Sequence, residues 1–162
     1  MAQHLYTSRI DIPAEARTDL VDLLNEHLAA TIDLHLQTKQ AHWNVKGPVF
    51  YALHTFFDDL AESVEPFIDE LGERVTALGG IARGTVRMAA AASPLPEYDE
   101  TIVTGEDSLA ALIERYAAYA ALTRKGIERA SEQEDAATED LLTEIARTID
   151  KDLYFLESHV QG

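Results

Sequence analysis

Apolar residues recur at helical spacing along most of the chain. The clearest stripe steps by three or four positions and consists of Phe50, Leu53, Phe57, Leu60, Val64, Phe67, Leu71, Val75 and Leu78. Nearer the N-terminus a second stripe recurs every fourth residue, at Leu20, Leu24, Leu28 and Ile32. Such stripes are typical of amphipathic helices that turn one apolar face toward a core. The pattern therefore predicts long helices over residues 13–45 and 48–78.

Breaks in this pattern separate the predicted helices. Gly47-Pro48 divides the first from the second, and Gly79-Gly80 ends the second. A short helix is expected over residues 85–92, before a segment that contains two prolines. Apolar periodicity then returns over residues 106–130 and 135–160 and predicts two further long helices.

Four long amphipathic helices in 162 residues predict an all-α fold, a four-helix bundle with a short extra helix in the connection between the second and third long helices. We expect a single domain over residues 1–162, with residues 1–12 as an N-terminal tail. Because that connection is the longest, the predicted order of the long helices is up-down-down-up.

Composition narrows the range of functions. The chain has no cysteine, which excludes disulfides, thiolate metal sites and cysteine nucleophiles. Its 29 acidic and 13 basic residues give a net charge of −16, which repels nucleic acid and attracts cations. A solubilising surface is the simpler interpretation of this surplus. With neither a signal peptide nor a membrane-spanning run in the sequence, we expect a cytoplasmic protein without a membrane partner.

Four polar residues form a second stripe on the predicted helix over residues 48–78. Taking His54 as the origin, Asp58 lies at about +40°, Asp69 at about +60° and Glu73 at about +100° around the axis. The apolar stripe centres at roughly −90°, so the polar stripe does not face the core of its own bundle. Along the axis the two pairs are roughly 22 Å apart, which is too far for one metal ion to bridge.

A second copy of the chain would close this gap. If its helix lies antiparallel across a two-fold axis near Ser63 and Val64, His54 and Asp58 of one copy face Asp69 and Glu73 of the other. His42 precedes the turn into this helix and can approach the His54 end. Imidazole and carboxylate without thiolate suit iron(II), manganese or zinc. The spacing thus predicts a metal site shared between two subunits.

Each part of this stripe has a simpler interpretation by itself. A carboxylate pair one turn apart is commonly a solvated helix face, and a single histidine is commonly a surface or interface residue. The alternative of a site inside the bundle is disfavoured, because such di-iron sites use Glu-x-x-His and no glutamate here precedes a histidine at that spacing.

The chain resembles the Dps family, the miniferritins of the ferritin-like superfamily. The resemblance rests on the segment Lys39-Gln40-Ala41-His42-Trp43-Asn44-Val45-Lys46-Gly47, followed by Leu53-His54, Asp58, Asp69-x-x-x-Glu73-Arg74 and Leu78-Gly79-Gly80. It covers essentially the whole chain, including Asp150-Lys151 and Phe155-Leu156-Glu157-Ser158 near the end. The combination is much more specific than any of these motifs taken singly.

This resemblance implies a ferritin-like bundle that assembles into a homododecamer with tetrahedral symmetry and a hollow interior. It implies ferroxidase sites at two-fold dimer interfaces, with His42, His54, Asp58, Asp69 and Glu73 as catalytic residues and iron ligands. The implied reaction is oxidation of Fe(II) by hydrogen peroxide, or by oxygen, with storage of Fe(III) as mineral and protection against oxidative stress. Trp43 would quench radicals beside the site, or simply pack there.

Other features qualify the resemblance. Acidic residues near the start of the last helix, Asp135, Asp140 and Glu144, are candidates for an iron-entry pore, or for a solvated helix terminus. His35 could mark an accessory metal site, although a packing role is the simpler interpretation. DNA-binding relatives often carry a lysine-rich tail, but residues 1–20 hold only Arg9 and Arg17 as basic residues. We therefore predict weak or absent direct DNA binding.

Two alternatives remain open at this stage. One is a non-enzymatic shell that compacts DNA on the same scaffold, and the intact set of five ligand positions disfavours it. The other is a shell that stores zinc or manganese without ferroxidase turnover, which the same ligands would also permit.

Overall fold

The computed structural model describes residues 5–161, so residues 1–4 of the predicted tail and residue 162 lie outside the described residues. The described part is helical and contains no strand, which confirms the predicted all-α class. Its helices are α1 (Ala14–Asn44), α2 (Phe50–Val64), α3 (Pro66–Ala77), α4 (Val86–Ala92), α5 (Gly105–Glu132) and α6 (Ala136–Ser158). Within this described part, no helix is both long and apolar enough to cross a membrane.

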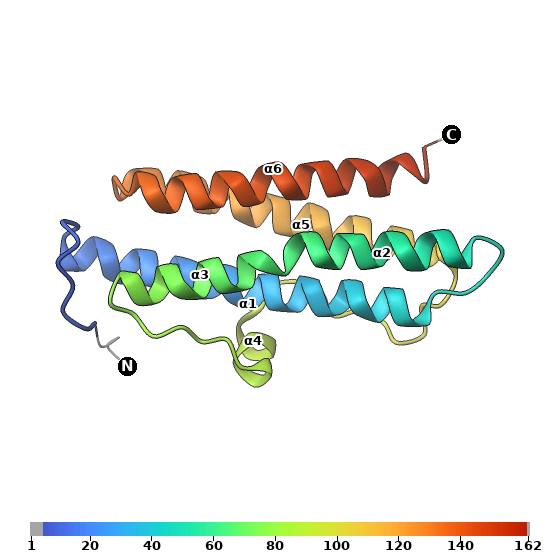
Figure 1. The fold of residues 1–162 in the computed structure, drawn as a ribbon, viewed down its shortest axis with the longest axis horizontal. Coiled ribbons are helices and arrows are strands. Elements are labelled where there is room, and N and C mark those ends of the chain that lie inside the picture. The colour runs from blue at the N-terminus through green and yellow to red at the C-terminus, as the bar shows by residue number, and fades with distance from the viewer. Residues whose placement is uncertain (1–4, 162) are drawn as a thin grey trace.

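The long helices form two layers (Figure 1). One layer holds α1 beside the end-to-end pair α2 and α3, and the other holds α5 beside α6, while the short α4 lies outside the bundle next to α1. The backbone N–H of Lys46 donates to the carbonyl of Val103 at 2.8 Å, so α5 begins at the end of the bundle where α1 finishes. The helices therefore follow the predicted up-down-down-up order.

The predicted helix over residues 48–78 is interrupted, so the expectation of one continuous helix was wrong. Pro66 has no N–H to donate, and α2 ends at Val64 while α3 begins at Pro66 itself. Glu65 between them keeps helical dihedral angles, φ −52° and ψ −45°. The chain therefore continues in nearly the same direction, and α2 and α3 lie end to end (Figure 1).

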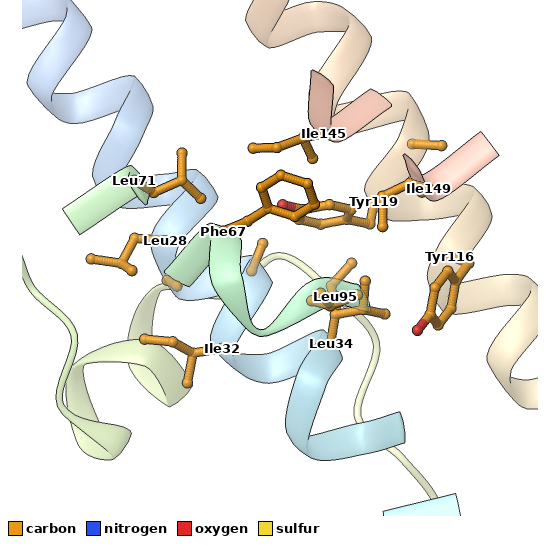
Figure 2. Packing of buried hydrophobic residues seen from close by; sticks show 14 of the residues in the cluster. Leu28, Ile32, Leu34, Phe67, Leu71, Leu95, Tyr116, Tyr119, Ile145 and Ile149 are labelled. Atoms are coloured by element: carbon orange, nitrogen blue, oxygen red, sulfur yellow. The ribbon is translucent and has the colours of Figure 1, made fainter. Parts of the chain in front are cut away.

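The core follows the apolar stripes. In the apolar stripe that runs from Phe50 to Leu78, every member from Leu53 onward is buried, whereas Phe50 at its start is 43% exposed. Figure 2 shows Phe67 of α3 beside Tyr119 of α5 and Ile145 of α6. Burying a large apolar side chain stabilises a fold by about 1.5–3 kcal/mol, so this stripe joins the two layers.

Two fully buried tyrosines need partners for their hydroxyl groups. The Tyr119 hydroxyl lies 2.6 Å from Thr31 Oγ1, and the Tyr116 hydroxyl lies 3.2 Å from Thr38 Oγ1. Burial raises the pKa of both phenols, so they remain protonated at any ordinary pH.

The N-terminal tail packs across the end of α3. The Tyr6 N–H donates to the carbonyl of Gly79 at 2.8 Å, and the Arg17 guanidinium donates to the carbonyl of Leu78 at 2.9 Å. Gly79 has φ +89°, and a Cβ there would lie 2.5 Å from the Tyr6 carbonyl oxygen. A glycine is therefore required where the tail crosses this helix end.

A buried acid joins α2 to α6. The Ser63 hydroxyl lies 2.5 Å from Asp152 Oδ2 and 2.8 Å from the Leu60 carbonyl oxygen, although it has one proton to donate. A protonated Asp152 would satisfy all three groups, by donating to Ser63 while Ser63 donates to Leu60. Burial accordingly raises the pKa of Asp152, against the hydrogen bond from Ser63 and the positive charge of Lys151.

This arrangement predicts a pH-dependent contribution to stability. Because the folded pKa of Asp152 exceeds the unfolded value near 3.8, its contribution is complete below that value and is lost as pH rises through the folded pKa. Asp152→Asn keeps a donor toward Ser63 at every pH, so it should stabilise the protein by about 1 kcal/mol near neutrality. Urea unfolding should show that Asp152→Asn increases the free energy of unfolding less at about pH 4 than at about pH 7. An equal gain at both would contradict the assignment.

Candidate metal centre

His42 and His54 lock each other in place. Their rings stack with centroids 3.8 Å apart and planes inclined by 22°. His42 Nδ1 lies 2.7 Å from the backbone oxygen of His54, and His54 Nδ1 lies 2.9 Å from the backbone oxygen of His42. A carbonyl can only accept, so both Nδ1 atoms carry the proton. In the neutral form of each ring the lone pair then lies on Nε2, which is the tautomer needed to bind a metal ion through that atom.

The turn between α1 and α2 creates this pairing. Gly47 takes φ +118°, which favours glycine, and its carbonyl accepts from the Phe50 N–H at 3.0 Å. The chain reverses direction at this turn, so that His42 on α1 and His54 on α2, which lie equally far from Pro48, come together. The Phe50 ring then packs on His54, with ring centroids 5.1 Å apart.

Asp58 lies one turn beyond His54 on α2 and faces α1. It forms an ion pair with Lys39, and its Oδ1 is 3.9 Å from His42 Nδ1. The hydrogen bond from Lys39, helped by the neighbouring histidines and opposed by partial burial, lowers the pKa of Asp58. The carboxylate is therefore ionised and available as an oxygen ligand.

The structure brings His42, His54 and Asp58 together but leaves Asp69 and Glu73 apart from them. Both of these carboxylates are exposed on α3, on the far side of the break at Pro66. Within residues 5–161, no three His, Cys, Asp or Glu side chains gather closely enough to hold a metal ion. The protomer thus presents two separate partial ligand sets, and their completion by a second copy stays a prediction.

Trp43 stands at the edge of the histidine pair. Its side chain is 62% exposed, and Lys39 Nζ lies 6.0 Å from the centroid of its ring. The sequence predicted a tryptophan beside the site but assigned no role to Lys39. The spacing held a signal, because Lys39 precedes His42 by three residues and Trp43 by four, which places all three on one helix face.

The three pore candidates occupy different environments. Asp140 and Glu144 are exposed on α6, as a pore lining would require. Asp135 is only 3% exposed; it caps the first turn of α6 and accepts two hydrogen bonds from Arg74, at 2.7 and 2.8 Å. The carboxylate of Asp135 therefore stabilises the fold of the protomer. The assignment to a pore stays a prediction for all three residues.

The remaining candidate, His35, also turns its Nδ1 toward a backbone carbonyl. That atom lies 3.1 Å from the oxygen of Ala61 on α2. This contact joins α1 to α2 and supports the packing role, and an accessory metal site there stays a prediction.

Comparison with known proteins agrees with this geometry. Residues 21–162 match the family model described as a ferritin-like domain, and the bundle with its histidine and carboxylate sets defines a protein of the ferritin-like class. The DNA protection during starvation protein of Agrobacterium fabrum is 42% identical over 156 residues, which span 96% of each chain. The chain belongs to this family, the Dps proteins.

Solved structures show the same relationship. The archaeal Dps homologue of Halobacterium salinarum superposes with a TM-score of 0.92 at 32% identity, over 99% of this chain and 90% of that one. DpsA14 of Streptomyces coelicolor superposes with a TM-score of 0.94, also at 32% identity, over 100% of this chain and 96% of that one. The predicted ferritin-like fold and family are thereby confirmed.

Proposed function

We propose that this protein is a ferroxidase and iron store that oxidises Fe(II) at sites shared between two subunits. The observation that carries the proposal is the pair of contacts between His42 and His54, in which the Nδ1 of each ring faces the backbone oxygen of the other residue. These contacts leave two imidazole Nε2 atoms available as ligands beside the ionised carboxylate of Asp58. A set of imidazole and carboxylate ligands without thiolate suits Fe(II). Asp69 and Glu73 of the partner subunit complete the site, and their additional negative charge favours the ferric product.

The substrate iron and the peroxide supply the redox chemistry. Two Fe(II) ions each give one electron, and hydrogen peroxide takes both with two protons to form two water molecules. Oxidation in this paired form releases no hydroxyl radical. The protein holds the iron through the clamped histidines, and Trp43 beside them is placed to intercept stray oxidants.

We further propose that twelve subunits form a hollow shell with tetrahedral symmetry, which stores the ferric mineral. The net charge of −16 per chain supports the storage of iron in such a shell, because an acidic shell draws cations toward its entrances and interior. Asp140 and Glu144, exposed on α6, remain candidates for lining such an entrance. Light scattering should give the mass of a dodecamer, and a lone dimer would contradict the shell.

The activity itself is tested with apo-protein mixed anaerobically with Fe(II) and then with hydrogen peroxide. Ferric absorbance should rise faster than in buffer, and the product should stay soluble with the protein. A rate equal to that in buffer would exclude the ferroxidase and leave a shell that stores another metal. The same assay with oxygen in place of peroxide identifies the preferred oxidant.

Direct DNA binding is expected to be weak near neutral pH. Twelve chains of net charge −16 repel phosphates, because binding to nucleic acid rests mainly on Lys and Arg. Protection of DNA would then come from removal of Fe(II) and peroxide. Clear retardation of plasmid in a gel at moderate salt and neutral pH would contradict this expectation.

A further inference from the structure

His27 lies near the middle of α1, and its imidazole is completely buried. Its Nδ1 lies 2.8 Å from the Leu23 carbonyl oxygen, which can only accept a hydrogen bond. Nδ1 therefore carries a proton, and the lone pair of the neutral ring lies on Nε2. Among residues 5–161, no group forms a hydrogen bond with this Nε2. The proposed metal site makes no use of this histidine, so its burial needs another explanation.

A glycine on α5 makes room for the ring of His27. A Cβ at Gly126 would lie 2.7 Å from both Cε1 and Nε2 of His27, and 3.1 Å from the Leu142 side chain on α6. Glycine is unfavourable inside a helix, and Gly126 lies well inside α5. The imidazole therefore fills a space that the absence of a side chain on α5 provides, at the place where α1, α5 and α6 meet.

This place suits a neutral imidazole and opposes a charged one. A second proton would put a positive charge into an interior of apolar side chains, where an ion is costly unless it is paired. Burial accordingly lowers the pKa of His27. The hydrogen bond to Leu23 opposes this lowering, as do the Glu26 carboxylate on α1 and the Leu122 carbonyl. The Arg129 guanidinium on α5 adds to it, and the side chain that α6 presents here is apolar.

We propose that His27 is an acid-sensitive latch between α1, α5 and α6, closed by the neutral imidazole and opened when that ring takes up a second proton. The charged ring is stabilised by water, so it leaves the space beside Gly126. Its departure leaves a cavity where the three helices meet, and the packing around a cavity is weakened. The latch involves neither iron nor the proposed ligands, so it stands independently of the proposed function.

Opening of the latch extends to the next turn of α1. Thr31 Oγ1 donates to the His27 carbonyl oxygen at 2.6 Å, and it lies 2.6 Å from the Tyr119 hydroxyl on α5. Because the Thr31 hydroxyl has a single proton, the Tyr119 hydroxyl donates to it. This contact between α1 and α5 thus depends on the position of the His27 backbone, and it loosens when the ring leaves.

The latch acts over a defined range of pH. The unfolded imidazole titrates near 6.5, and the folded protein takes up the same proton only at lower pH. The stability that His27 contributes is therefore complete above 6.5 and is lost as pH falls through the folded pKa. Each pH unit in this range should lower the folding equilibrium constant by up to about tenfold. Asp152 acts with the opposite sign, so variants must be compared with wild type at the same two pH values.

Urea unfolding of the assembled protein, at fixed subunit concentration, tests the latch. Wild type is compared with His27→Gln and His27→Leu, neither of which takes up a proton. Between about pH 7.5 and about pH 5.5, the folding equilibrium constant of wild type should fall by at least about threefold more than that of either variant. His159→Gln removes an exposed histidine and should keep the wild-type dependence on pH.

The space beside Gly126 is tested by a pair of substitutions. Gly126→Ala places a methyl group against the His27 ring and should lower the urea midpoint of wild type. In a His27→Ala background the same substitution should not lower the midpoint, because the methyl group enters space that the ring has left. An equal loss with and without the ring would contradict the fitted space on which the latch depends.

Amide hydrogen exchange locates the opening and needs no variant to fold. After correction for the intrinsic effect of pH on exchange, wild-type peptides around His27, Gly126 and Leu142 should exchange faster at about pH 5.5 than at about pH 7.5. Peptides of α3, which contains no histidine, serve as the reference. No faster exchange at the three positions, or the same dependence of stability on pH in wild type and His27→Gln, would overturn the latch.

Discussion

Replacing His54 with alanine is expected to slow peroxide-driven oxidation of Fe(II) by at least about tenfold, since even outer partners of metal ligands are worth that much. Two losses combine in this variant. The Nε2 ligand disappears, and so does the Nδ1–H that donates to the backbone oxygen of His42 at 2.9 Å. His42 in turn loses the ring stacked 3.8 Å from its own, although its Nδ1 keeps the backbone oxygen of residue 54 as its acceptor.

A second variant separates these losses. The side-chain amide of His54→Asn can still donate to the His42 carbonyl, but it offers no imidazole lone pair. If ligation is the main role, His54→Asn should be as slow as His54→Ala. His159→Ala is the control, because that histidine is exposed at the C-terminal end of α6, where its Nδ1 lies 2.8 Å from the Phe155 carbonyl oxygen and its ring stacks on Phe56, away from the proposed ligands. Stopped-flow ferric absorbance measures all three, and a wild-type rate in His54→Ala would contradict the assigned site.

Replacing Asp135 with alanine should destabilise the protomer by about 3 kcal/mol, the lower end for breaking a buried ion pair. The carboxylate accepts two hydrogen bonds from Arg74, and it caps α6 through the N–H groups of Ala137 and Thr138. Its loss removes the ion pair of the largely buried Arg74, which keeps only its hydrogen bond to Thr138 Oγ1, and leaves the first turn of α6 without a cap. Denaturant unfolding at fixed subunit concentration measures the change, since assembly also shifts apparent stability.

Lowering the pH should reduce the loss of stability that Asp135→Ala causes. Burial by itself would raise the pKa of Asp135, but hydrogen bonds from Thr138 and Arg74 outweigh it and lower the pKa below its usual value near 3.8. The contribution of Asp135 is therefore complete above that value and is lost as pH falls through the folded pKa. Asp140→Ala is the control, because Asp140 is exposed on the same helix. Equal effects of the two substitutions near neutrality would contradict the buried role of Asp135.

The sequence predicted the helices well where apolar spacing alone determines them. The break at Pro66 was missed because the apolar stripe continues across it, from Val64 to Phe67, with both residues buried. Periodicity reports which face is buried, whereas a proline acts through its missing N–H and leaves the apolar spacing unchanged. The presence of Pro66 in the sequence was the signal that could have predicted the break.

The site was predictable in its members but not in its internal bonds. His42 and His54 meet because they flank one turn, which spacing reveals. Their reciprocal bonds depend on where two backbone carbonyls point at the ends of α1 and α2, and no residue pattern encodes that direction. The capping role of Asp135, in contrast, could have been predicted from its place at the start of the helix expected over residues 135–160.

The central claim is that the metal site is divided between subunits, and mixed assemblies test it most directly. His54→Ala damages the histidine half of the site, and Glu73→Ala damages the carboxylate half. When both chains are co-expressed with separable tags, assemblies containing both can be isolated and their rate of Fe(II) oxidation measured. The control mixes His54→Ala with His42→Ala, which both damage the same half.

In a random mixture of His54→Ala and Glu73→Ala chains, about a quarter of the sites would pair two intact halves, because each two-fold dimer holds two equal sites. The mixed assemblies should therefore recover about a quarter of the wild-type rate, while each parent and the control mixture remain slow. Mixed assemblies as slow as their parents would contradict a site shared between subunits.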